Sequence, residues 1–132
     1  MGYNKYLDGI RPSSLEGMVV SDADMCDAIG AEGILRTHAY ALAKGHSFFD
    51  TSLPPTDTVP DGETYRASAG HSVQHFFDKL LIIPSIMMTA AGREEAVKRE
   101  KIMIDFLEEL FREARAERWQ VKLRTFQDKN TS

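Results

Sequence analysis

The chain has 132 residues, a length that suits one domain with its own hydrophobic core. Its apolar content of 42% and charged content of 27% are ordinary for a soluble globular protein. A net charge of −4 argues against broad nucleic-acid binding, which needs a basic surface, so we expect no nucleic-acid partner.

Cysteine usage and hydropathy indicate the compartment. Cys26 is the only cysteine, so a disulfide within the chain is excluded and a reducing environment is the simplest interpretation. The first ten residues lack the apolar stretch of a secretory signal. The longest apolar run, residues 75–88, is interrupted by Asp78 and Lys79 and is too short to span a bilayer. We expect a cytoplasmic protein with no membrane partner.

The first third of the chain predicts two helices. Residues 12–20 begin with proline and two serines, so a serine is expected to cap a short helix that delivers the acidic residues after it. Residues 29–44 show a second helical pattern, with Gly45 as its stop. The glycines and alanine at its start indicate that another backbone approaches closely. Its expected apolar face contains Leu35, His38, Ala39 and Leu42.

A long loop is predicted at about 45–70, because this segment is rich in proline, threonine and serine. A helix then resumes and is expected to end at Pro84. Its apolar residues follow the i, i+3, i+4 rule: Val73, Phe76, Phe77, Leu80 and Leu81.

Thr89 is expected to cap the longest helix of the chain. Its predicted buried stripe is Met103, Phe106, Leu107, Leu110, Phe111 and Ala114, and its predicted solvated face carries Glu94, Arg99, Glu108 and Arg112. In the tail from about 119, Trp119, Val121 and Leu123 alternate, which predicts an extended arm or a short strand. The whole chain, 1–132, is therefore predicted to be one all-α domain, with this tail as a possible C-terminal arm.

Three carboxylates, Asp22, Asp24 and Asp27, lie within six residues of one another. One interpretation is helix capping, because acidic side chains are favoured at helix N-termini. The other is metal binding, because carboxylate oxygens are hard ligands that suit Mg²⁺ or Mn²⁺. Local spacing alone favours capping.

Two segments resemble HD-domain phosphohydrolases. SDADMCDAIGAEGILRTHAY, which starts at Ser21, is similar to the bacterial branch with the pattern D-A-D-R-L-D-A-I-G-A-x-G-I-A-R-T. HFFDKLLIIPSIMMTAAGREEAVKRE, which starts at His75, resembles that branch's H-F-x-x-K-L-L segment and the following M-x-T and G-x-x-x-A-x-x-R steps. The resemblance covers about three quarters of the chain, and two ordered motifs are fairly specific evidence.

The resemblance implies roles for five residues. Asp24 matches the last metal-ligating aspartate of the family, and Asp22 and Asp27 match acids that flank it. Arg36 matches an arginine that faces a phosphate or pairs with an acid. His75 falls near the family's pocket. Separately from the resemblance, Lys79, one turn further on, is a candidate to form a cationic wall with Arg36 for a phosphate-containing ligand. The alternative, which the sequence alone favours, is a solvated lysine that pairs with Asp78 or a glutamate. The arginine that often follows the aspartate is Met25 here.

The family's histidine and His-Asp dyad, which precede that aspartate, are absent from this sequence. All four histidines follow Asp24, and none is followed by aspartate. The chain therefore resembles the C-terminal portion of an HD domain, truncated or degenerate. We favour a helical binding or oligomerisation module that is non-catalytic alone. The alternative is a metal-dependent phosphohydrolase of nucleotides or phosphate esters, completed by another chain or a missing N-terminal part.

A homodimer is expected, because loss of N-terminal helices would expose apolar surface that a second copy could cover. Two further candidates are given structural roles. His71 and His75 have the i, i+4 spacing of a zinc pair, but a zinc site needs three or four ligands. Cys26 is expected to be a packing residue, because the neighbouring acids would raise its pKa.

Overall fold

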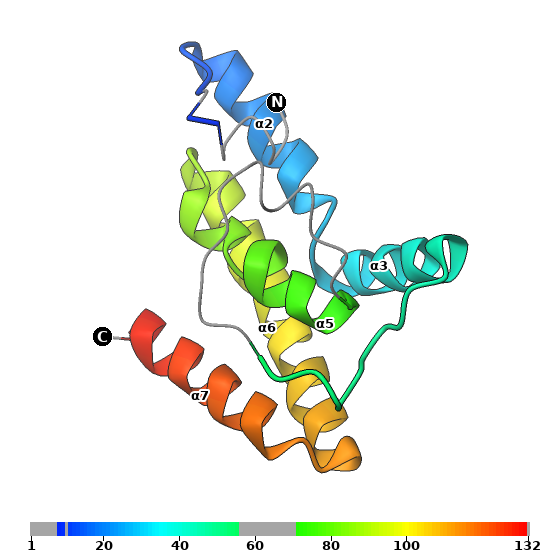
Figure 1. The fold of residues 1–132 in the computed structure, drawn as a ribbon. Coiled ribbons are helices and arrows are strands. Elements are labelled where there is room, and N and C mark those ends of the chain that lie inside the picture. The colour runs from blue at the N-terminus through cyan, green and yellow to red at the C-terminus, as the bar shows by residue number, and fades with distance from the viewer. Residues whose placement is uncertain (1–7, 10, 56–70, 132) are drawn as a thin grey trace.

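The computed structural model describes residues 8–9, 11–55 and 71–131, and all regular structure in these ranges is helical (Figure 1). The all-α prediction is therefore confirmed. The elements are α2 (Leu15–Cys26), α3 (Gly30–Lys44), α5 (Ser72–His75), a π-helical turn η1 (Phe76–Leu80), a 3-10 helix η2 (Ile83–Ile86), α6 (Ala90–Ala114) and α7 (Glu117–Thr131). None of the helices described is long and apolar enough to cross a membrane.

Helix α6 is the central helix of the fold, and α2, α3, η2 and α7 all pack against it. In Figure 1, α2 lies beside the N-terminal end of α6, and α7 returns alongside its C-terminal half. The core lies around α6 and includes Met103, Leu107 and Phe111 of this helix together with Phe76 and Trp119.

Three helix boundaries follow the local signals in the sequence. The Ser14 hydroxyl accepts a hydrogen bond from the Gly17 N–H at 3.0 Å and caps α2. Gly45 ends α3 in the left-handed conformation, with φ of 69°. Thr89 Oγ1 accepts from the Gly92 N–H at 3.0 Å and caps α6. These three predictions are confirmed.

All five apolar residues of the segment 73–81 are buried, as predicted. The backbone is less regular than predicted, because α5 passes into the π-helical turn η1, in which the Leu81 N–H bonds to the Phe76 carbonyl at 2.7 Å. Pro84 lies inside η2 instead of following a continuous helix. Proline has no N–H and its ring clashes with the carbonyl four residues earlier, so an α-helix cannot continue through it.

The tail is a helix, and the predicted arm or strand from 119 is wrong. Trp119 and Leu123 are both 2% exposed and Phe126 is half-buried, whereas Val121 points to solvent. The buried positions thus recur at i, i+4 and i+7, which is the period of a helix packed on one side. Trp119, Val121 and Leu123 span only five positions. A segment of this length is too short to distinguish the two-residue period of a strand from the period of a helix.

The predicted apolar face of α3 is also wrong. Leu35 and Leu42 are 71% and 69% exposed, and His38 and Ala39 are exposed as well. The side of α3 that carries small residues faces the core instead, through Gly30, Gly33 and Ala41. The predicted close approach is real at Gly30, where a Cβ would lie 2.9 Å from the Arg99 side chain.

On α6, Met103, Leu107 and Phe111 are buried and Phe106 and Leu110 are half-buried, but Ala114 is exposed at the helix end. Arg99, predicted to be solvated, lies in the interface with α2. Its Nη1 donates to the Cys26 carbonyl at 2.8 Å and reaches the Ile29 carbonyl at 3.5 Å, while its Nε donates to Glu95. Arg99 therefore caps the C-terminal end of α2.

Asp22 makes the matching contact at the other end of the interface. Its side chain is 2% exposed. Oδ1 accepts from the Met88 N–H at 3.0 Å, and Oδ2 accepts from the Thr89 N–H at 2.7 Å and the Thr89 hydroxyl at 2.6 Å. Gly92 leaves room for this carboxylate, because a Cβ there would overlap Asp22 Oδ2. Capping is thus the role of Asp22, although it caps the distant helix α6 and not the turn that follows it.

Beyond α3, residues 46–55 contain no helix, and 56–70 lie outside the described residues. The Phe49 ring lies 5.7 Å from that of Trp119, whose Nε1 donates to the Leu53 carbonyl at 3.3 Å. This part of the predicted loop is therefore anchored on the core.

Replacing Asp22 by alanine should lower the free energy of unfolding by about 3 kcal/mol, because buried donors at Met88 and Thr89 lose a charged acceptor. Urea unfolding followed by circular dichroism measures the change. Asp24→Ala is the matched control on the exposed side of α2 and should change stability by less than about 0.5 kcal/mol. Equal losses in the two variants would contradict a capping role specific to Asp22.

Candidate functional site

Four helical segments bring together four of the residues selected from the sequence. Asp24 comes from α2, Arg36 from α3, His75 from α5 and Lys79 from η1. Burial lowers the pKa of Lys79, the negative charge of Asp24 raises it, and the positive charge of Arg36 lowers it. The charge of Lys79 in turn acts on His75. Asp24, Arg36 and His75 therefore lie within electrostatic reach of Lys79, and these four side chains are called the Asp24–Lys79 cluster below.

The segment that carries His75 and Lys79 is irregular at this point. His75 ends α5, and Lys79 lies in the π-helical turn η1. Single π-helical turns are rare and are frequently found at functional sites. Both side chains are half-buried, whereas Asp24 and Arg36 are exposed on the neighbouring helices. The cluster thus has a semi-enclosed base and a solvent-facing rim.

His75 is a neutral member of the cluster at neutral pH. Burial lowers its pKa to about 4, and the nearby charge of Lys79 contributes to the same direction. The remaining charged groups are two cations, Lys79 and Arg36, and one carboxylate, Asp24. This balance favours an anionic ligand over a metal cation.

The residues that the structure describes do not fit a divalent metal centre. In the described ranges, no group of three or more histidine, cysteine, aspartate or glutamate side chains is placed to hold a metal ion. Both oxygens of Asp22 already accept hydrogen bonds from Met88 and Thr89, so of the two metal candidates only Asp24 has an exposed carboxylate. Metal sites need several ligands in a fixed geometry, so Asp24 alone does not supply one.

His71, the other candidate for a zinc pair, belongs to the core. Its ring lies 5.1 Å from Trp119 and 5.9 Å from Phe49, and its pKa is lowered by burial. Cys26 is buried too, with Sγ 3.8 Å from Met87 Sδ. Burial is the main reason that its pKa is raised, and Asp22 adds to the shift. Both structural roles expected from the sequence are confirmed.

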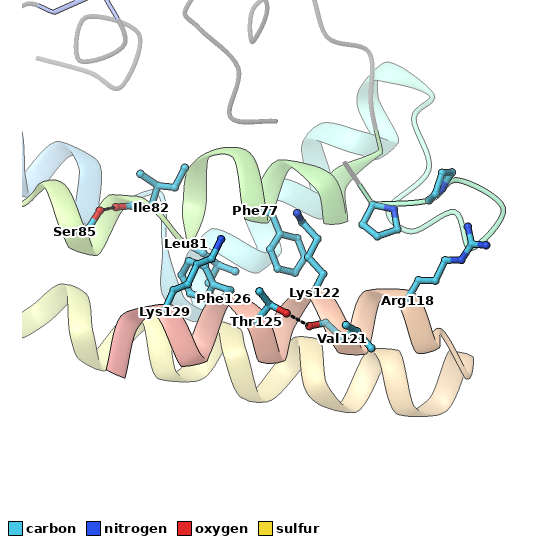
Figure 2. Close-up of a pocket in the computed structure, with 12 residues that line it drawn as sticks. Phe77, Leu81, Ile82, Ser85, Arg118, Val121, Lys122, Thr125, Phe126 and Lys129 are labelled. Carbon is cyan, nitrogen blue, oxygen red and sulfur yellow. Dashed lines mark hydrogen bonds between the residues drawn. The ribbon is translucent and has the colours of Figure 1, made fainter. Parts of the chain in front are cut away.

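Sequence reasoning missed a groove beside α7, because the tail was predicted to be extended. The groove has a volume of about 1000 Å³ and is lined along α7 by Arg118, Lys122 and Lys129 as well as apolar residues (Figure 2). A helical reading of the tail would have revealed these cations at i, i+4 and i+11, along one side of the helix.

Comparison with known proteins supports the fold. YpgQ of Bacillus subtilis (strain 168), described as uncharacterized, is 39% identical over 100 residues. A crystal structure of a Lactobacillus plantarum protein superposes with a TM-score of 0.77 at 34% identity and covers 86% of this chain. A Bacillus thuringiensis protein described as an HD-superfamily hydrolase gives a TM-score of 0.63 at 40% identity, over 78% of this chain. No protein-family model matches.

The chain spans about half the length of these relatives. It covers 40% of YpgQ, 53% of the Lactobacillus plantarum chain and 48% of the Bacillus thuringiensis chain. A structure of Bacillus subtilis YpgQ in complex with ADP gives a TM-score of 0.59 at 36% identity, over 77% of this chain and 45% of that one. This protein therefore has an HD-like helical fold and resembles part of longer HD-like proteins.

The buried His75 should make stability depend on pH. Its pKa is about 4 in the folded protein against an ordinary 6.5, so the unfolded chain takes up a proton first as the pH falls. The contribution of His75 to the free energy of unfolding is fully present above pH 6.5. As the pH falls to 4.5, the free energy of unfolding should drop by about 2 to 3 kcal/mol because of this residue. Urea unfolding at pH 7 and 4.5 should show a smaller fall for His75→Gln than for wild type.

His46→Gln is the control, because His46 is exposed in the segment after α3. Its pH dependence should match that of the wild type. A wild-type dependence that persists in His75→Gln would assign the effect to other groups.

Proposed function

We propose that this chain acts on its own as a helical binding and oligomerisation module, and that it is not a complete hydrolase by itself. The observation that carries the proposal is the exposure of large apolar side chains on α2 and α3. Leu15 and Val20 of α2 are 72% and 62% exposed, and Leu35 and Leu42 of α3 are exposed to a similar extent. Large apolar side chains that are exposed on neighbouring helices are candidates for an interaction surface.

The exposed side of α3 has the spacing of a helix-pairing seam. Leu35 and Leu42 are seven residues apart, with Ala39 between them on the same side, so they form a stripe along two turns. The opposite side of α3 already packs on the core through glycine and alanine. A second copy of the chain is the simplest cover for these faces, because most soluble oligomers are symmetric homomers.

Sedimentation equilibrium should show a homodimer, and isothermal titration with Mn²⁺, Mg²⁺ and Zn²⁺ should show no binding that depends on Asp24. The isolated chain should not turn over a generic phosphatase substrate, because Asp24 is the single carboxylate that remains available in the cluster. Asp24→Ala is the comparison for both assays. If the chain stays monomeric over a wide concentration range, the proposed oligomerisation function is wrong. Turnover that Asp24→Ala abolishes would show a catalytic site within this chain.

A second candidate function is a metal-dependent phosphohydrolase of nucleotides or phosphate esters, completed by another chain or by a missing N-terminal part. Two observations favour it. The Asp24–Lys79 cluster has a net positive charge, and the similar proteins include one described as an HD-superfamily hydrolase and one crystallised with ADP. In such an assembly Asp24 would be one of several metal ligands, and Arg36, His75 and Lys79 would contact the phosphate.

The anion-binding part of this candidate is testable in the isolated chain. Inorganic phosphate and ADP should shift the NMR resonances of residues around Lys79. Lys79→Gln should weaken binding about tenfold, which is the effect of losing one charge-assisted contact. Lys101→Gln is the control, because Lys101 is exposed on α6 and pairs with Asp105. If Lys79→Gln and wild type bind phosphate and ADP with equal affinity, Lys79 does not contact the phosphate.

A further inference from the structure

We propose that the groove beside α7 receives the exposed face of helix α2 from a second copy of the chain, antiparallel to α7. This inference rests on the proposed oligomerisation function and names the two surfaces that meet. Each chain carries both surfaces, so two chains can exchange them reciprocally in a two-fold dimer.

One wall of the groove is apolar, and the other, which α7 forms, carries both cationic and apolar residues. Phe77, Leu81 and Ile82 form the first wall, and α7 forms the second with Val121 and Phe126 among its cations (Figure 2). Lys122 Nζ lies 5.3 Å from the Phe77 ring centroid, so cationic and apolar groups meet inside the groove. An occupant must therefore present apolar and acidic groups on the same face.

The cations extend along the groove and are not gathered at one end. Arg118, Lys122 and Lys129 occur at intervals of four and seven residues on α7. At 1.5 Å per residue the outer two are about 16 Å apart along the helix axis. A small anion with one charged group would meet one of these cations, whereas a helix with several acids would meet all three.

The exposed face of α2 has this composition. Leu15, Val19 and Val20 are exposed apolar residues, and the neighbouring exposed acids are Glu16, Asp24 and Asp27, the last at the C-cap. The helix contains no lysine or arginine. By comparison, the exposed positions of α3 carry both signs, at Glu32, Arg36 and Lys44, so α3 matches a row of cations less well.

The spacing of the acids matches the spacing of the cations in one direction. Counting back from Asp27, the acids fall at 0, 3 and 11 residues; counting forward from Arg118, the cations fall at 0, 4 and 11. An antiparallel alignment therefore places Asp27 opposite Arg118, Asp24 opposite Lys122 and Glu16 opposite Lys129. In a parallel alignment, Glu16 opposite Arg118 would leave Asp24 between the other two cations.

The same alignment also matches the apolar residues. Val19 lies eight residues before Asp27, level with Phe126, which lies eight residues after Arg118, and Val20 lies level with Thr125 one position away. The docked face of α2 is distinct from the face that holds Asp22 and Met25 against the core. Helix α2 can therefore dock on a second copy while its inner face stays packed on its own core.

Charge reversal tests the two surfaces separately. The groove variant combines Arg118→Glu with Lys129→Glu, and the helix variant combines Glu16→Lys with Asp27→Lys, so neither touches Asp24. Each variant alone should weaken dimerisation at least about tenfold in sedimentation equilibrium, because like charges then face each other. An equimolar mixture of the two variants should restore the dimer, since both exchanged contacts are again complementary. Circular dichroism confirms that each variant is folded.

Lys98→Glu with Lys101→Glu is the matched control, because it makes the same charge change on the exposed side of α6. It should leave the dimer unchanged. If the wild type dimerises and neither reversal weakens it, or if the mixture does not recover, the inference is wrong and the proposed oligomerisation stands. Weakening by Leu35→Ser with Leu42→Ser alone would then assign the interface to α3. A wild-type monomer would overturn both proposals.

Discussion

The reciprocal capping of α2 and α6 is the interaction on which the rest of this structure depends. Asp22 of α2 accepts hydrogen bonds from the backbone and side chain at the start of α6, and Arg99 of α6 donates to the last carbonyl of α2. Two charged groups at opposite ends of one interface fix both the direction and the register of the helices, because a shift of either helix leaves buried polar groups unpaired. Helix α3 begins at Gly30 against the Arg99 side chain, so its start is set by the same contact.

This arrangement divides the acidic cluster into two roles. Residues two apart on a helix point about 200° apart, so Asp22 turns into the interface while Asp24 faces solvent beside Lys79. Sequence spacing identified both as candidates for one site. The helix places them in different environments, and the partner of Asp22 comes from 67 residues further along the chain.

Features that depend on contacts between residues close together in the chain could be predicted from the sequence. Ser14, Thr89 and Gly45 end their helices through contacts within a few residues, and the buried run 73–81 has an apolar pattern strong enough to survive an irregular backbone. The inward face of α3 and the interface role of Arg99 were mispredicted because each depends on which side α6 approaches. The side of α3 that packs on the rest of the chain carries small residues. The larger apolar residues are on its opposite side, which the hydrophobic pattern therefore predicted to be buried. Three of the four members of the Asp24–Lys79 cluster were found through resemblance, since they come from separate segments with no shared local pattern.

Helix α2 connects the core, the Asp24–Lys79 cluster and the proposed interface. Its inner face holds the register with α6, and its outer face carries both Asp24 and the apolar residues proposed to dock on a second copy. In the proposed dimer, Asp24 lies opposite a partner cation while it also faces Lys79 of its own chain. Sharing the carboxylate weakens its attraction to Lys79, which leaves the cluster with a larger positive potential. In the proposed dimer, dimerisation and anion binding would therefore be coupled through Asp24, and because such coupling is reciprocal, an anion at Lys79 would strengthen the dimer by the same factor as the dimer strengthens anion binding.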